Sequence, residues 1–141
     1  MGKMETKPNA SPVKGRILVV DDEPFTLDLI KLTLATASFH VETAASGEIA
    51  LQLLQDGSFD LMLLDVMMPE VSGFDLLRRL HSTEAAAPPV IILSAVGTRD
   101  AKKVGEELGV IGYLVKPVTR GALLDAVYSA LDISANDNPS H

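Results

Sequence analysis

Short apolar runs in this sequence end, four times, at residues whose side chains can do chemistry. These are the carboxylates Asp21, Asp22 and Asp65, the hydroxyl Ser94 and the ammonium Lys116. Three carboxylates brought together repel one another unless a cation lies among them, and an all-oxygen set with room for water suits Mg²⁺. Because Mg²⁺ and Lys116 would together balance three carboxylates, such a site could accept a phosphoryl group.

Each of these residues also has an ordinary structural explanation. Polar residues often end strands, and Asp21 and Asp22 before Glu23 and Pro24 could simply open a helix. A single Lys is usually solvated. The combination favours a site, because unrelated capping needs would not place acids on two neighbouring strands and a hydroxyl and a Lys on the next two.

The runs that would position these residues are predicted to be strands. They are too short for free-standing helices, and their apolar content suits strands buried on both faces: Ile17 to Val20, Leu61 to Leu64, Val90 to Leu93 and Tyr113 to Val115. A fifth segment, His40 to Ala44, alternates more strongly and contains Glu42 and Thr43, which predicts a strand at an edge of the sheet.

Helix-length segments with apolar residues at 3.6-residue spacing separate the strands. Their apolar stripes are Leu27, Ile30 and Leu34; Leu76, Leu77 and Leu80; Ala101, Val104 and Leu108; and Leu124, Val127 and Leu131, with a further helix at Gly47 to Asp56. Strands alternating with helices predict an α/β fold with a parallel sheet and helices on both faces. Ligands of such sheets bind beyond the carboxyl ends of the strands, where the polar residues fall.

Composition sets limits on class and partners. A length of 141 residues suits one domain, and no second core is evident. The segments 1–15 and 134–141 are rich in Pro, Asn, Ser and Lys, so we expect flexible tails around a domain at 16–133. Without a long apolar stretch or a secretory signal, we expect a cytoplasmic protein with no membrane partner. A net charge of −7 opposes direct binding to nucleic acid, and the absence of Cys excludes disulfides.

Four sequence runs resemble, in order and spacing, the receiver domains of bacterial response regulators. The runs are ILVVDDEP, DLMLLDVMMPEVSGFDLL, VIILSA and GYLVKPV, and the resemblance covers Arg16 to Ile133. It implies a doubly wound, flavodoxin-like fold whose five strands are ordered 2-1-3-4-5. It also implies that Asp65 accepts a phosphoryl group from a histidine kinase or a histidine phosphotransfer protein, with Mg²⁺ as the cofactor.

The resemblance assigns roles to individual residues. The metal ligands would be the carboxylates of Asp21, Asp22 and Asp65 and the backbone carbonyl of Met67. The remaining roles depend on the phosphoryl group: Lys116 would contact one of its oxygens and Ser94 would move toward it, while Tyr113 matches the switch aromatic residue.

The Lys116–Pro117 bond matches a bond that is usually cis in the family, although X-Pro bonds in general are mostly trans. Val118 departs from the family pattern, in which an aromatic residue often follows the Lys-Pro pair. This departure leaves the site intact and makes the output surface harder to assign.

The output face is expected to run from Arg99 to Leu131 and to bind a downstream protein. An ordinary solvated helix face is an equally good explanation of its charged residues, which are Arg99, Lys102, Lys103, Glu106 and Glu107. Because the sequence ends soon after the domain, we expect no DNA-binding or enzymatic output attached to it, with an excised fragment as the alternative. A homodimer is left open.

Two other classes remain as alternatives to a signalling domain that is not an enzyme. Aspartyl-phosphate hydrolases resemble Asp-x-Asp at the nucleophile, whereas the second acid position here is Met67. A flavodoxin-like cofactor-binding module would need a phosphate-cradling turn, but the first strand leads into DDEPF, which lacks glycines and hydroxyls at this point.

If Asp65 is phosphorylated, the apolar residues Met67 and Val96 are expected to obstruct an attacking water and slow hydrolysis.

Overall fold

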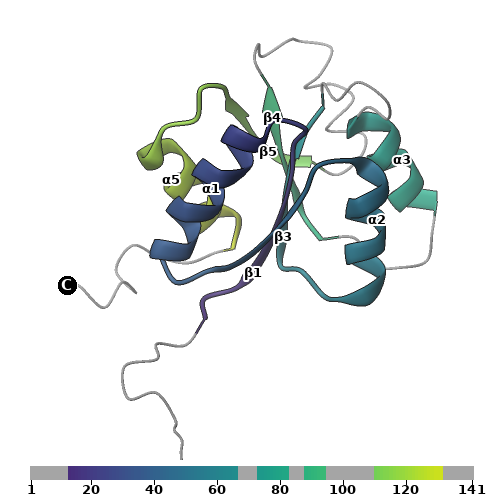
Figure 1. The fold of residues 1–141 in the computed structure, drawn as a ribbon, viewed down its shortest axis with the longest axis horizontal. Coiled ribbons are helices and arrows are strands. Elements are labelled where there is room, and N and C mark those ends of the chain that lie inside the picture. Colours follow the sequence, from purple (N-terminus) through teal and green to yellow (C-terminus); the bar gives the residue numbers. More distant parts are fainter. Residues whose placement is uncertain (1–12, 67–72, 83–87, 95–109, 132–141) are drawn as a thin grey trace, which may run out of the picture.

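The computed structural model describes residues 13–66, 73–82, 88–94 and 110–131 (Figure 1). Strands and helices alternate along most of this length, as the sequence predicts. In chain order the elements are β1 (Arg16–Val20), α1 (Pro24–Thr36), β2 (His40–Ala44), α2 (Gly47–Asp56), β3 (Leu61–Asp65), α3 (Gly73–Ser82), β4 (Val90–Ser94), β5 (Val110–Val115) and α5 (Arg120–Ala130).

The five strands form one parallel sheet in the order β2-β1-β3-β4-β5. This order confirms the predicted fold class, and β2 lies at an edge, as its alternating pattern indicates. The register pairs Val20 with Leu64 and Asp65 with Leu93, so the carboxyl ends of β1, β3 and β4 lie nearly level.

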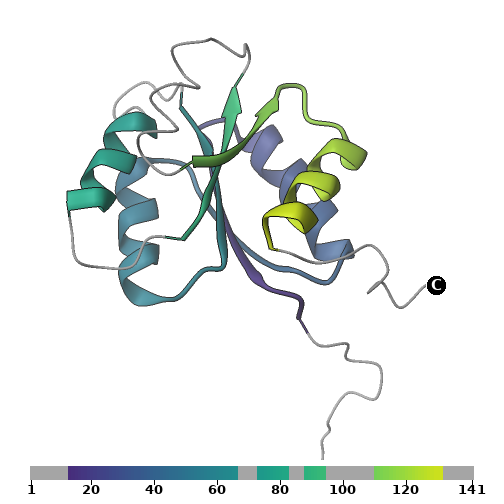
Figure 2. The same ribbon diagram turned by 180° about the vertical axis from the view of Figure 1, so that it is seen from behind.

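The helices cover both faces of the sheet. Helices α1 and α5 lie on one face and α2 and α3 on the other, as the two opposite views show (Figures 1 and 2). Successive side chains of β1 alternate between two cores: Ile17 and Val19 pack with α1 and α5, whereas Leu18 and Val20 pack with α2 and α3. This alternation explains why the central strands are continuous apolar runs.

Strand β5 differs from its prediction. We expected Tyr113 to Val115 to be buried on both faces, but β5 is the second edge of the sheet and begins at Val110. Ile111 is 52% exposed and Val115 is 57% exposed, and Leu114 is the one buried residue of the strand. The prediction of burial on both faces was wrong: β5 lies at the margin of the sheet, where its side chains are less enclosed than those of the central strands.

Helix α5 packs through Leu123 and Val127 instead of the predicted stripe of Leu124, Val127 and Leu131. Leu124 and Leu131 are only partly buried, at the margin of the core. Two adjacent Leu residues fit the helical spacing almost equally well, so periodicity alone assigned the wrong one. The helix predicted from Ala101, Val104 and Leu108 lies outside the described residues.

Candidate functional site

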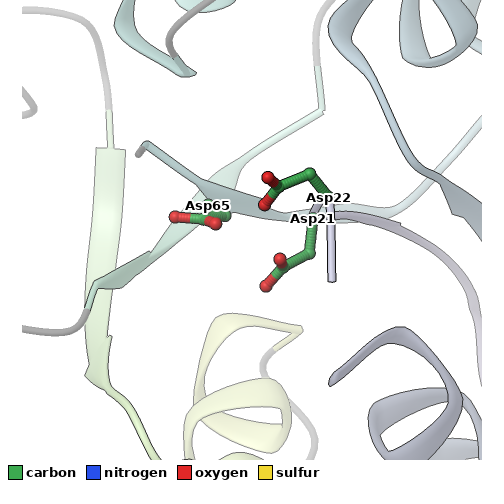
Figure 3. A group of neighbouring side chains, drawn as sticks. All are labelled: Asp21, Asp22 and Asp65. Carbon is green, nitrogen blue, oxygen red and sulfur yellow. The ribbon is translucent and has the colours of Figure 1, made fainter. Parts of the chain in front are cut away.

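Three carboxylates meet at the carboxyl ends of β1 and β3, which are neighbours in the sheet (Figure 3). Asp21 and Asp22 directly follow β1, and Asp65 is the last residue of β3. One oxygen from each carboxylate lies within 4.8 Å of the others. Asp21 is completely buried, Asp65 is 4% exposed and Asp22 is exposed, so the cluster opens to solvent on the side of Asp22.

The main chain fixes Asp21 in this position. Its backbone N–H donates a hydrogen bond to the carbonyl of Ala44 in β2 at 3.1 Å. Its Oδ1 atom accepts a hydrogen bond from the backbone N–H of Glu23 at 3.0 Å. Pro24 then begins α1, where a missing N–H costs nothing. The backbone and the side chain of Asp21 are therefore both held by hydrogen bonds to the main chain.

Lys116, directly after β5, brings an ammonium into the cluster. Its Nζ atom lies 2.7 Å from Asp21 Oδ2 and donates a hydrogen bond to Asp65 Oδ2 at 3.2 Å. Burial favours the neutral amine, but the carboxylates of Asp21 and Asp65 outweigh it and raise the pKa of Lys116 above its ordinary value. Lys116 therefore stays protonated at neutral pH. The Lys116–Pro117 peptide bond is cis.

The cluster suits a divalent cation. Three carboxylates and one ammonium leave two formal negative charges in a largely buried space. The buried Oδ2 atom of Asp21 has Lys116 Nζ, at 2.7 Å, as its charge partner among the described residues. Hard oxygen ligands with an opening to water are what Mg²⁺ requires, so the residues fit this ion.

The other predicted site residues are described only in part. Ser94 ends β4 opposite Val115, so its backbone lies at the same edge of the sheet, but its side chain is outside the described residues. Tyr113 lies in β5 and packs, partly buried, against the core that contains α2 and α3. Met67 and Val96 both lie outside the described residues.

Sequence reasoning missed a surface beside the acidic cluster. A groove of about 290 Å³ runs between α1 and the chain after β5, with apolar walls that include Phe25, Leu29 and Val118. Glu23 and Lys116 also line it, which connects it to the cluster. Phe25 is 78% exposed. Its place directly after the acidic turn was visible in the sequence, but its exposure depends on packing that no local pattern predicts.

Comparison with known families identifies this arrangement. The family profile described as the response regulator receiver domain matches residues 17–128. The chain belongs to this family. It is a receiver domain of two-component response regulators, which confirms the prediction and leaves the hydrolase and cofactor-module alternatives without support. The match lies within the predicted domain at 16–133, whose exact limits and flexible tails remain predictions.

Curated relatives and solved structures agree with the family. The receiver domain is 37% identical over 116 residues to the transcriptional regulatory protein CusR and 42% identical over 116 residues to the transcriptional regulatory protein CpxR, both of Escherichia coli K12. Each match covers 82% of this chain but only 51% of CusR and 49% of CpxR, so the chain spans about half the length of these relatives. A crystal structure of the Vibrio cholerae chemotaxis protein CheY4 superposes with a TM-score of 0.78 at 32% identity, covering 82% of this chain and 98% of CheY4.

Family membership supports a role in signalling. Receiver domains of response regulators interact with kinases and with downstream effectors, and they generally bind Mg²⁺ through acidic residues. This chain has a cluster of three Asp carboxylates that could hold such an ion. In the described part of the chain, no helix is both long and apolar enough to cross a membrane.

Proposed function

We propose that this receiver domain accepts a phosphoryl group on Asp65 from the phosphohistidine of a histidine kinase or histidine phosphotransfer protein, in a reaction that requires Mg²⁺. One observation carries the proposal. The buried Asp65 carboxylate lies beside the carboxylates of Asp21 and Asp22 and accepts a hydrogen bond from Lys116. A nucleophile, a cation site and a fixed positive charge are thus in contact, which is what phosphoryl transfer requires.

In the proposed step, a carboxylate oxygen of Asp65 attacks phosphorus in line with the bond to the donor imidazole. That P–N bond breaks, its electron pair leaves with the imidazole nitrogen, and an acyl phosphate forms on Asp65. Lys116 would meet the negative charge on the transferred oxygens, and Mg²⁺ held by Asp21, Asp22, Asp65 and the Met67 carbonyl would offset the rest.

The proposed consequence is a change in packing on the side of β4 and β5. Phosphorylation replaces one negative charge by about two and adds strong acceptor oxygens. The Ser94 hydroxyl would turn toward these oxygens and free space for Tyr113. The switch would then shift the population of two packings and alter the face from Arg99 to Leu131, where a downstream protein would bind.

The surface beside the cluster supports a protein as donor. The imidazole of a donor must reach Asp65, which is only 4% exposed, so the donor must dock closely around it. Phe25 and Leu29 of helix α1, which line the groove beside the cluster, are 78% and 46% exposed, and Leu32, about one turn further along the helix, is 64% exposed. Such an apolar surface suits a protein partner better than a free small molecule. Homodimer formation, the absence of nucleic-acid binding and a cytoplasmic location remain predictions.

The test is incubation with a small phosphodonor, with and without Mg²⁺, followed by intact mass spectrometry. We expect one phosphoryl group per chain, formed only with Mg²⁺. Asp22→Ala should lose labelling together with Mg²⁺ affinity, whereas the control Asp56→Asn, an exposed acid at the end of α2, should label like the parent. Steady release of free phosphate would indicate a hydrolase, and no modification would contradict a phosphoacceptor.

A further inference from the structure

Glu23 is the third acidic neighbour of Lys116 and belongs to none of the roles described above. Its Oε1 atom lies 4.0 Å from Lys116 Nζ, beyond the contacts of 2.7 Å to Asp21 and 3.2 Å to Asp65. The Glu23 side chain is 66% exposed, whereas that of Lys116 is 18% exposed. The ammonium therefore lies between two buried carboxylates and one solvated carboxylate.

The two buried partners of Lys116 are needed elsewhere. Asp21 and Asp65 are also two of the three carboxylates proposed to hold Mg²⁺. An ammonium in contact with both of them repels an arriving cation and occupies oxygens that could bind it. Binding of Mg²⁺ therefore requires Lys116 to give up part of its contact with Asp21 and Asp65, and this loss weakens metal affinity unless another anion receives the ammonium.

The position of Glu23 suits it to receive the ammonium. Its backbone N–H donates a hydrogen bond to Asp21 Oδ1 at 3.0 Å, which keeps the Glu23 backbone beside the cluster. Its Oε1 atom, the one nearest Lys116, accepts a hydrogen bond from the Thr26 hydroxyl at 3.1 Å. Although Glu23 is the N-cap residue of α1, its side chain makes no capping hydrogen bond to the helix. The carboxylate is thus directed to one side without being committed to the backbone.

We propose that Glu23 is a positioning residue for Lys116: it receives the ammonium when Mg²⁺ takes Asp21 and Asp65, and so raises metal affinity while keeping Lys116 beside the phosphoryl site. This inference rests on the proposed Mg²⁺ site. Glu23 would act through Lys116 and would not ligate the metal. Its contribution should therefore depend on the presence of Lys116, whereas simple attraction between Glu23 and the cation should not.

A double-mutant cycle separates these two effects. The Mg²⁺ Kd would be measured by NMR titration of backbone amides for the parent, Glu23→Gln, Lys116→Met and the double variant. We expect Glu23→Gln to weaken binding about twofold to fivefold with Lys116 present, the scale of a partly exposed ion pair, and less than about 1.5-fold in the Lys116→Met background. Asp28→Asn, which removes an exposed acid from the same helix, is the matched control and should change Kd little in either background.

The outcomes distinguish this inference from the proposed function. Equal weakening in both backgrounds, or no weakening in either, would overturn the role of Glu23 while leaving the metal site in place. A parent that binds no Mg²⁺ would overturn the metal site and the role of Glu23 with it. Glu23→Gln should also leave the metal-free Tm within about 2 °C of the parent, since an exposed pair stabilises little. A larger loss would show that Glu23 serves to stabilise α1, and would also overturn the inference.

Discussion

Charged residues gather at both ends of the sheet, but they differ in burial and in hydrogen bonding. At the amino end, the backbone N–H of Arg16 donates to Asp60 Oδ2 at 2.8 Å, and its guanidinium donates to the carbonyl of Ser58 and to Glu42 Oε2 at 2.8 and 3.0 Å. The guanidinium also lies over the ring of Phe59, at 4.8 Å from its centroid. These charges are partly solvated and hydrogen-bonded, with 38% of the Arg16 side chain and 34% of the Glu42 side chain exposed.

At the carboxyl end, like charges are buried together. Asp21 and Asp65 are almost inaccessible, and Lys116 is their common counter-ion. Burying a carboxylate without full hydrogen bonding costs stability. The comparison indicates that the charged groups at the amino end stabilise the fold, whereas burial of those at the carboxyl end costs stability, as expected for the cation site and the nucleophile that we propose there.

Replacing one Asp by Asn at each end of the sheet should give the largest difference in labelling by a phosphodonor. Asp65→Asn deletes the proposed nucleophile while keeping the side-chain shape, so labelling by a phosphodonor should fall at least about 100-fold. Asp60→Asn should label like the parent, because the Asp60 carboxylate accepts its hydrogen bond from Arg16 at the amino end of the sheet. Intact mass spectrometry measures both. Comparable labelling of Asp65→Asn and the parent would remove the distinction between the two ends.

Lys116→Met should separate metal binding from phosphotransfer. We expect Mg²⁺ affinity to be retained or increased, because a competing cation is removed. We expect labelling to fall about tenfold or more, because the charge proposed to meet the phosphoryl oxygens is lost. NMR titration and labelling rates are the measurements. A variant that lost only metal binding would contradict the role of Lys116.

The effect of Lys116→Met on the free energy of unfolding should depend on pH in a defined way. Because folding raises the pKa of Lys116, its ion pairs with Asp21 and Asp65 stabilise the fold from neutral pH up to the ordinary value of 10.5, and this contribution is lost as pH rises through the raised pKa. The difference in unfolding free energy between parent and Lys116→Met should therefore stay constant from neutral pH to about pH 9 and change only above 10.5.

Arg16→Met, at the amino end of the sheet, should lower stability without affecting Mg²⁺ binding or labelling. The variant keeps an apolar stem but loses the hydrogen bonds to Ser58 and Glu42, so the free energy of unfolding should fall by about 1–2 kcal/mol. Urea denaturation followed by circular dichroism measures the loss. Mg²⁺ affinity and the labelling rate should equal those of the parent, and a change in either would show that the two ends are coupled.

Glu42→Gln should have the smallest effect. The hydrogen bond from His40, followed by the contact with Arg16, lowers the pKa of Glu42 despite some opposing desolvation. A lowered pKa means that the carboxylate stabilises the fold above its unfolded value, about 4.5, and that this contribution disappears as pH falls through the folded value. At pH 7 we expect a loss of a few tenths of a kcal/mol, as for other exposed pairs. A loss that did not diminish as pH fell below about 4.5 would not come from the charge of Glu42.

The sequence predicted the central strands and the acidic cluster well because both depend on local signals. Runs such as Leu61 to Leu64 can hardly be anything but buried strands, and a parallel sheet necessarily brings their following residues to one edge. The exposure of β5 could not be predicted, since its apolar residues resemble those of the core strands. Nor could the contact between Glu23 and Lys116, which depends on how the chain after β5 returns to the start of α1.

The alternation of β1 and β3 between two apolar cores has a further consequence. Because both faces of these strands are apolar, a slip or insertion of one residue would still place apolar side chains against each helical layer. It would, however, turn Asp65 toward the opposite face of the sheet. Hydrophobic burial alone therefore does not distinguish the correct register of the central strands. A chain with a single inserted residue in β3 could retain much of its compactness and secondary structure and yet be unable to receive a signal.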